Sequence, residues 1–363
     1  MNTSTRHRIG VLTGDGIGAE IVPVATAVTD AAGTREGVGF DWQSLPFGRS
    51  AITEHGSAIP ASTLSALDDL GIWIAGPHDN AGYPAAHRDG PPPGAVLRKH
   101  FGLSANLRPA HAFSGVAATA PEIDVLIVRE NSEGLYADRN MAVGSGEFMP
   151  TPDVALAVGL ITRAASERIA HQACRLAAGR SGRVTIVHKA NVLRLSTGLF
   201  RDVCREVAAH YPGLVVDEKH VDAMAALLVR RPADFDVLVT ENLFGDILSD
   251  LAGELAGSLG LAGSVNCSDR QVMAQAAHGA APDIAGQGIA NPVAIVVSTA
   301  MALRWWGLRI DDERLGRVAD RIDAAVAATL ADGVRTPDLG GAASTSEMGA
   351  ALVARVLQGE QRS

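Results

Sequence analysis

The sequence predicts an α/β fold, because short apolar runs alternate with longer stretches that carry apolar residues at helical spacing. Runs with the length and aliphatic composition of buried strands occur at residues 9–12, 72–75, 125–128, 184–187 and 236–239. Glycine or polar residues end each run, and a helical pattern lies downstream. This alternation is typical of helices packed on a largely parallel sheet. At 363 residues, the chain is also long enough for two domains.

Two helices and one loop are predicted between these strands. Residues 154–178 carry one long amphipathic pattern, and a second helical pattern follows Asn242. Residues 82–94 are predicted to form a loop, because the three successive prolines at 91–93 remove three backbone donors.

Composition limits the possible partners and the cellular location. The net charge is −9 and there is no tract of Lys and Arg, so nucleic acid is not an expected partner. The three cysteines are widely separated and form no Cys-x-x-Cys pair, which argues against a disulfide framework or a zinc knuckle. The first eight residues are polar, and no apolar run approaches the ~20 residues of a membrane span. We therefore expect a cytoplasmic protein without a membrane partner.

A glycine-rich turn follows the first predicted strand, in the order Gly14-Asp15-Gly16-Ile17-Gly18. Its spacing differs from the Gly-x-Gly-x-x-Gly fingerprint, so a Rossmann domain is not predicted. Taken alone, such a turn is structural at least as often as it is functional.

Asp246 and Asp250 lie four residues apart in the helical pattern after the last predicted strand. This spacing puts both carboxylates on one helix face, where their oxygens could bind Mg²⁺ or Mn²⁺. An exposed acidic face is the alternative, but apolar neighbours such as Phe244 and Leu248 make a fully solvated face less favourable. Asp222 is a further carboxylate that could complete the site or simply cap a helix.

Three arginines, Arg98, Arg108 and Arg129, could bind a substrate with two or three carboxylates, because a guanidinium group pairs with a carboxylate through two hydrogen bonds. Each alone could equally form a surface ion pair. Arg129 is the most informative, because it directly follows the strand predicted at 125–128, and α/β proteins bind ligands at the carboxyl ends of strands.

Longer motifs extend from Gly14 to about Gly341 and cover most of the chain. They are GDGIGAE from Gly14, LRKHFGLSANLRP from Leu97, VRENSEGLY from Val128, HKANVLRLSTGLF from His188, VDAMA from Val221, TENLFGDILSD from Thr240, HGAAPDIAGQGIANP from His278 and RTPDLGG from Arg335. In this order they resemble the β-decarboxylating dehydrogenases, which act on isocitrate, homoisocitrate, 3-isopropylmalate, and tartrate or D-malate. The resemblance is closest to the NAD-type homoisocitrate and isocitrate dehydrogenases.

The resemblance implies the fold of isopropylmalate dehydrogenase, which has two interlocked α/β domains and is not a Rossmann fold. A large cofactor-binding domain would comprise residues 1–103 and 257–363, and a small domain of residues 104–256 would form a homodimer. Each active site would then contain side chains from both protomers.

The resemblance also implies a role for each candidate residue around the substrate. Asp246 and Asp250 of one protomer and Asp222 of the other would bind one Mg²⁺ or Mn²⁺. Lys189, also donated across the dimer, would be the general base and Tyr136 the general acid. The three arginines named above would bind the substrate carboxylates.

For the cofactor, the resemblance places Asn191 near the nicotinamide and a loop around the adenosine part. The loop residues are His278, Gly279, Asp283, Ile284 and Asn291. A carboxylate at 283 accepts hydrogen bonds from both ribose hydroxyls and repels a 2′-phosphate, whereas NADP-preferring members carry Lys and Tyr at 283 and 284. NAD is therefore the expected cofactor.

The reaction that the resemblance implies is the oxidative decarboxylation of a 3-substituted (R)-malate, a 2-hydroxy di- or tricarboxylate, to a 2-oxo acid and carbon dioxide. Tartrate or D-malate dehydrogenase activity is one alternative. A non-catalytic regulatory subunit is another, but the chain retains Tyr136, Lys189 and all three aspartates, which such subunits typically lose in part.

Two segments depart from the family pattern. Residues 92–97 provide no Ser, Asn or Arg for a third carboxylate, so the pocket for the 3-substituent is either apolar and roomy or is lined from the preceding loop. The candidates on that loop are His78, Asn80, His87 and Arg88. Gln275 replaces a glutamate that most members carry, which predicts altered binding of NAD.

Overall fold

A ten-stranded mixed sheet runs through the whole protein in the computed structural model, which describes residues 6–88, 90–136, 141, 144 and 146–358. The strand order is β2-β1-β3-β12-β11-β4-β5-β10-β8-β9. The strands are β1 (Arg6–Leu12), β2 (Gly39–Ser44), β3 (Ile72–Ala75), β4 (Ala105–His111), β5 (Asp124–Glu130), β8 (Arg183–His188), β9 (Val215–His220), β10 (Val237–Thr240), β11 (Val265–Cys267) and β12 (Val272–Ala274). The α/β fold class is thereby confirmed.

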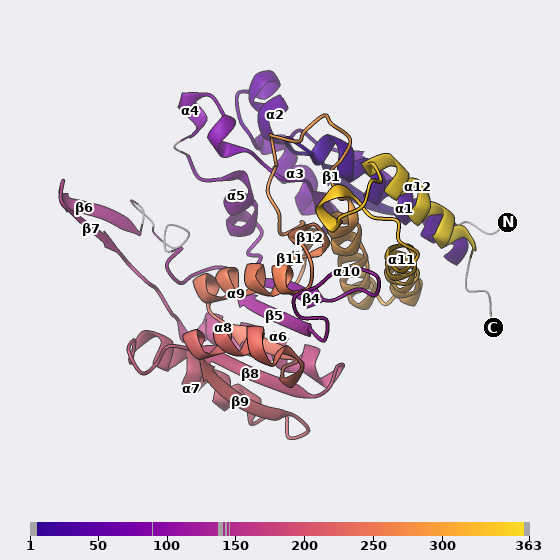
Figure 1. Ribbon diagram of the computed structural model, residues 1–363. Helices are drawn as coiled ribbons and strands as arrows, with labels where there is room; N and C mark the ends of the chain where they lie inside the picture. The colour runs from indigo at the N-terminus through magenta and orange to yellow at the C-terminus, as the bar shows by residue number, and fades with distance from the viewer. Residues whose placement is uncertain (1–5, 89, 137–140, 142–143, 145, 359–363) are drawn as a thin grey trace.

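Helices cover both faces of this sheet (Figure 1). They are α1 (Gly18–Glu36), α2 (Gly48–His55), α3 (Ala61–Leu70), α4 (Ala85–Arg88), α5 (Pro93–His100), α6 (Arg163–Ala178), α7 (Ser196–Ala208), α8 (Val221–Arg230), α9 (Asn242–Leu255), α10 (Val293–Ile310), α11 (Glu313–Ala331) and α12 (Thr345–Gln358). The first and the last helix lie side by side, because α12 packs on α1.

Side chains alternate between the two faces of β5, which fixes the helices on each side. Leu126 and Val128 belong to the apolar core that includes α6 and α7, whereas Val125 and Ile127 belong to the core that includes α8 and α9. Because both faces of the strand are buried, its sequence is a continuous apolar run rather than an alternating one.

The five strands predicted from apolar runs are confirmed as β1, β3, β5, β8 and β10. The single helix predicted over 154–178 is wrong at its start, because α6 begins only at Arg163, where the Thr162 hydroxyl accepts a hydrogen bond from the Ala165 backbone N–H (3.2 Å). The loop predicted over 82–94 is also partly wrong, since it contains α4 and the first residues of α5. Pro93 starts α5 because the first residue of a helix needs no backbone donor.

The segment before α6 forms instead a hairpin arm of β6 (Glu147–Thr151) and β7 (Val154–Ala157). The arm extends away from the body of the protein (Figure 1), and all of its strand residues are exposed. Its apolar side chains include Phe148, Met149 and Leu156. A lone two-stranded hairpin is marginally stable in water, so these side chains favour an additional partner surface.

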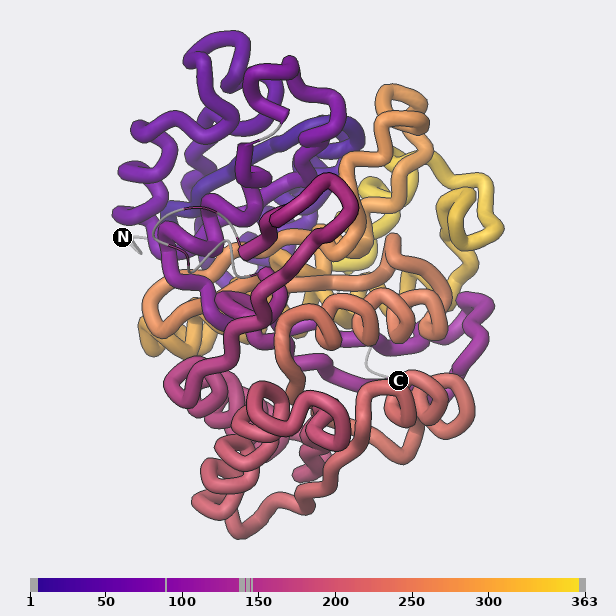
Figure 2. The backbone as a smooth tube through the Cα atoms, turned by 90° about the vertical axis from the view of Figure 1, so that its left-hand side faces the viewer, coloured from indigo at the N-terminus to yellow at the C-terminus, as the bar shows by residue number. Residues whose placement is uncertain are grey.

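Figure 2 shows the indigo and yellow ends of the chain together at one end of the molecule and the pink middle segment at the other. β4 and β11 pair in the middle of the sheet, so the sheet is continuous between the part with both chain ends and the part with the middle segment. The domain boundaries near residues 104 and 257 stay a prediction.

One helix in the described part of the chain, α10, is long and apolar enough to cross a membrane by length and composition. It packs against α1, α11 and β12, and 56% of its residues are buried in the protein. Its apolar residues therefore serve the core.

Candidate active site

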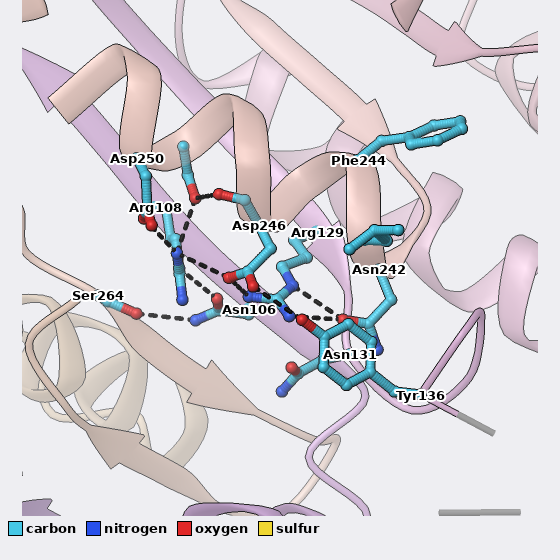
Figure 3. Close-up of polar contacts among 12 residues, drawn as sticks. Asn106, Arg108, Arg129, Asn131, Tyr136, Asn242, Phe244, Asp246, Asp250 and Ser264 are labelled. Atoms are coloured by element: carbon cyan, nitrogen blue, oxygen red, sulfur yellow. Dashed lines mark hydrogen bonds and ion pairs between the residues drawn. The ribbon is translucent and has the colours of Figure 1, made fainter. Parts of the chain in front are cut away.

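The guanidinium group of Arg129, at the end of β5, lies at the centre of the candidate site (Figure 3). Its Nε and Nη2 both donate to Asn242 Oδ1, at 2.9 and 2.7 Å. Its Nη1 forms an ion pair with Asp246. The guanidinium carbon also lies 5.5 Å from the centre of the Tyr136 ring. Arg129 is only 5% exposed, so these partners fix its orientation.

Asp246, in the second turn of α9, contacts one hydroxyl group and two guanidinium groups. The Tyr136 hydroxyl donates to its Oδ2 (2.8 Å), and Arg108 Nη1 lies 3.3 Å from its Oδ1, beside Arg129. Burial alone would raise the pKa of Asp246, but the charges of the two arginines and the hydroxyl contact lower it below its usual value. The carboxylate is therefore held in its ionised form.

Arg108, on β4, connects this group to the second acidic residue. Its Nη1 donates to Asp250 Oδ1 (3.1 Å) and to Ser249 Oγ (2.7 Å). Its Nε donates to Asn106 Oδ1 (2.7 Å), and the Asn106 amide in turn donates to Ser264 Oγ (2.8 Å). Five of the predicted residues thus form one contact network: Arg108, Arg129, Tyr136, Asp246 and Asp250.

Strand register explains why these distant residues meet. β10 is the parallel neighbour of β5, and Thr240 pairs with Arg129. Helix α9 starts two residues later and packs on β5. Gly245 allows this approach, because a Cβ atom there would lie 2.6 Å from Arg129 Cγ.

The Asp246 and Asp250 carboxylates suit a hard divalent cation by their oxygen chemistry and shared helix face. Among the residues that the structure describes, no three His, Cys, Asp or Glu side chains form a group able to hold a metal. Asp222, the third predicted carboxylate, is therefore not grouped with Asp246 and Asp250 within one chain.

Lys189 and Asp222 lie apart from this network and contact each other, with Nζ 2.5 Å from Oδ1. They follow the ends of the neighbouring strands β8 and β9, where His188 pairs with His220. β9 lies three strands from β5, which corresponds to about 14 Å across the sheet. Within one chain, the predicted base and third metal ligand are therefore not part of the arginine and aspartate network.

Arg98 lies on α5, beside His78 from the preceding loop. A Cβ atom on Gly94 would lie 2.9 Å from His78 Nε2 and 3.3 Å from Arg98 Nη1, so both groups lie over this glycine. Burial, together with the charge of Arg98, lowers the pKa of His78 and favours the neutral imidazole. Of the loop candidates for the substituent pocket, His78 is thus next to a predicted substrate residue.

The loop with the predicted adenosine-binding residues packs on the glycine-rich turn. The Ile17 N–H donates to Ala280 O (3.0 Å). At Gly16, where φ is +55°, a Cβ atom would lie 2.0 Å from that same oxygen. The Gly286 N–H donates to Glu20 Oε1 (2.6 Å). The turn therefore shapes the predicted cofactor loop.

The predicted cofactor residues have different environments. Burial lowers the pKa of His278. Its ring Nδ1 lies 3.0 Å from the backbone oxygen of Gly279. Asn291 is buried and donates to Asp338 Oδ2 (3.0 Å), which makes it a support of the loop. Asp283 is exposed. Ile284 is half-buried next to it, and Asn191 is exposed two residues after Lys189.

Sequence reasoning missed several polar residues behind the site. Asn106, Asn242 and Ser249 orient the two arginines, as described above. Asp15 was noted only as part of the glycine-rich turn, yet its carboxylate accepts from the Asp79 backbone N–H (2.9 Å) and the Tyr83 hydroxyl (2.7 Å) and so holds the loop before α5. For Asn106 the available signal was a polar residue within a buried strand, and for Asn242 and Asp15 it was a polar residue two or three positions after one.

Comparison with known proteins identifies the family of the chain. Residues 8–352 match the isocitrate/isopropylmalate dehydrogenase family. The chain is 40% identical to the 3-isopropylmalate dehydrogenase of Archaeoglobus fulgidus, over 94% of this chain and 96% of that protein. It is 41% identical to the isocitrate/homoisocitrate dehydrogenase of Thermus thermophilus, over 96% of this chain and 98% of that protein.

A solved structure of an isocitrate dehydrogenase has the same fold. The isocitrate dehydrogenase of Methylococcus capsulatus superposes with a TM-score of 0.85 at 38% identity, covering 97% of this chain and all of that one. These relatives differ in the substrates for which they are named, so they indicate a reaction class rather than one substrate. The chain belongs to the isocitrate/isopropylmalate dehydrogenase family, whose members are decarboxylating hydroxy acid dehydrogenases.

Proposed function

We propose that the protein oxidises and decarboxylates a 3-substituted (R)-malate, with NAD as hydride acceptor and Mg²⁺ or Mn²⁺ as cofactor. The observation that carries this proposal is the contact network of Arg108, Arg129, Tyr136, Asp246 and Asp250. It combines groups for binding carboxylates, for holding a divalent cation and for transferring a proton.

Each side chain has a role that its chemistry supports. Arg108 and Arg129 bind substrate carboxylates. Asp246 and Asp250 would hold the metal, and the bound metal and nicotinamide supply polarisation of the C2 oxygen and acceptance of the hydride from C2. Tyr136 donates its phenolic proton to C3 after carbon dioxide leaves, and Asp246 orients that hydroxyl.

We further propose that two protomers share each active site. Lys189 of the second protomer accepts the proton of the C2 hydroxyl, and Asp222 of the same protomer adds a third carboxylate. Their pairing at a distance from Asp246 in one chain supports this arrangement. Val229 on α8 and Ile247 on α9 are more than half exposed, which suits burial between two copies of these adjacent helices. The exposed hairpin arm is a second candidate for the dimer contact.

NAD is favoured over NADP because Asp283 offers a carboxylate where a 2′-phosphate would be repelled. The 3-substituent is proposed to meet His78 and Arg98, which lie together over Gly94. This environment favours a polar substituent over an isopropyl group. Tartrate stays a second candidate, because its 3-hydroxyl is a small polar substituent, and D-malate stays with it as the compound that has only hydrogen at C3.

A substrate panel tests the proposal. Purified protein is assayed for NADH absorbance and for carbon dioxide with isocitrate, homoisocitrate, 3-isopropylmalate, tartrate and D-malate, with and without Mn²⁺, and with NADP in place of NAD. We expect metal-dependent turnover of at least one compound with a polar substituent. No turnover of any compound would favour a regulatory subunit, and turnover without added metal in the presence of a chelator would contradict the metal site.

A further inference from the structure

We propose that Asn242 is a positioning residue, which holds Arg129 in its substrate-binding orientation and connects it to the segment that carries Tyr136. This inference rests on the proposed function of Arg129 as a carboxylate-binding residue. Figure 3 shows the Asn242 side chain pointing toward Arg129, on the same side as the Tyr136 ring.

The Asn242 side chain uses all of its polar groups in this connection. Its Oδ1 accepts from Arg129 Nε at 2.9 Å and from Nη2 at 2.7 Å. Its Nδ2 donates to the Glu133 backbone oxygen at 2.9 Å, three residues before Tyr136. Asn242 is 0% exposed, so water cannot replace these contacts. One amide thus fixes the plane of the guanidinium and the start of the Tyr136 segment together.

The Asn242 side chain is not needed to cap its own helix. Asn242 is the first residue of α9, but the cap of that helix is Glu241, whose carboxylate accepts from the Leu243 and Phe244 N–H groups at 3.0 and 2.8 Å. The backbone donors at the helix start therefore already have partners. The Asn242 amide is left to bind Arg129.

The side chain at 242 also orients Arg129 better as an uncharged amide than as a carboxylate. A carboxylate at 242 could accept the same two hydrogen bonds, but it would neutralise Arg129 and place a further negative charge near the buried Glu241. An amide oxygen orients the guanidinium and leaves its positive charge for Asp246 and for a substrate carboxylate.

The test measures binding separately from turnover. The affinity of the full-length protein for D-malate is measured by calorimetry with Mn²⁺ and without NAD, so that no reaction occurs. Asn242→Ala and the isosteric Asn242→Asp are expected to weaken D-malate binding at least tenfold. Asn266→Ala is the matched control. Asn266, on β11, is also a buried amide, but its side-chain oxygen accepts from Asn131 Nδ2 (2.9 Å) and not from an arginine. We expect this control to bind D-malate within about twofold of the wild type.

A double-mutant cycle shows whether Asn242 acts through Arg129. In the Arg129→Lys background, Asn242→Ala should cost less than threefold in affinity, because the fork of hydrogen bonds is already lost. In turnover assays, Asn242→Ala should raise KM for the substrate, whereas partial misfolding would lower kcat at constant KM.

Unchanged affinity in both Asn242 variants, or equal costs in the wild-type and Arg129→Lys backgrounds, would overturn the inference. A wild-type protein that binds D-malate but turns over no compound of the panel would overturn the proposed function and leave the binding test intact. A wild-type protein that binds no dicarboxylate would overturn both.

Discussion

Glu133 is expected to make the stability of the protein fall as the pH rises. Its side chain is 4% exposed, and its two carboxylate oxygens accept from the Thr162 backbone N–H (2.7 Å) and the Thr162 hydroxyl (2.8 Å). Burial outweighs these hydrogen bonds and raises the pKa of Glu133 to about 7, from an ordinary value of 4.5. The Glu133→Gln variant removes this titration and can keep both contacts, because a hydroxyl can accept from the new amide.

The size of the effect follows from the two pKa values. Between pH 4.5 and pH 7, the folded protein keeps a proton on Glu133 that the unfolded chain has released. The contribution of this group is therefore full below the unfolded pKa and is lost as the pH rises through the folded pKa. The total corresponds to about 3 kcal/mol, most of which lies between about pH 5 and about pH 8.

Urea unfolding at these two pH values, at one fixed protein concentration, provides the measurement. The free energy of unfolding of Glu133→Gln minus that of the wild type should be larger at the higher pH than at the lower one, by roughly 2 to 3 kcal/mol, because only the wild type loses stability over this range. Glu122→Gln, at an exposed carboxylate, should show no such change. A difference between Glu133→Gln and wild type that stays constant with pH would refute the reasoning.

Three further predictions concern the shared site and the cofactor. Mixing inactive Lys189→Ala with inactive Asp246→Asn should restore about a quarter of wild-type activity in a refolded mixture, because half of the sites in a mixed dimer are intact; no recovery would argue against shared sites. Asp283→Lys with Ile284→Tyr should shift the ratio of kcat/KM values toward NADP, and an unchanged ratio would count against the assignment. Gly16→Ala should raise KM for NAD and lower the melting temperature, since its methyl group would meet a backbone oxygen of the cofactor loop at 2.0 Å; normal NAD kinetics would disprove the coupling.

The strands that the sequence predicts are those buried on both faces, because only these require continuous apolar runs. β9 was not predicted, because it lies at the edge of the sheet and its largely exposed sequence, VVDEKH, contains no continuous apolar run. β11 and β12 have three residues each, too few to show a period. β7 was read as helix because apolar residues in a short segment satisfy both periods.

The site was predictable to the extent that its chemistry is local. The spacing of Asp246 and Asp250 places two carboxylates on one helix face without any tertiary information. The role of Asn242 depends on Arg129, 113 positions away, and a single buried amide leaves no pattern in a sequence. The pairing of Lys189 with Asp222 likewise depends on two parallel strands meeting in register.

The charges of the contact network explain why a metal and a dicarboxylate should bind together. With their carboxylates ionised, Asp246 and Asp250 balance Arg108 and Arg129, and the four side chains are neutral as a set. A divalent cation alone would add two positive charges beside two arginines, and a dicarboxylate alone would add two negative charges beside two aspartates. Both penalties are large in a partly buried site, where the effective dielectric constant is low. Bound together, the cation and the dicarboxylate restore neutrality, so each should strengthen the affinity for the other by the same factor.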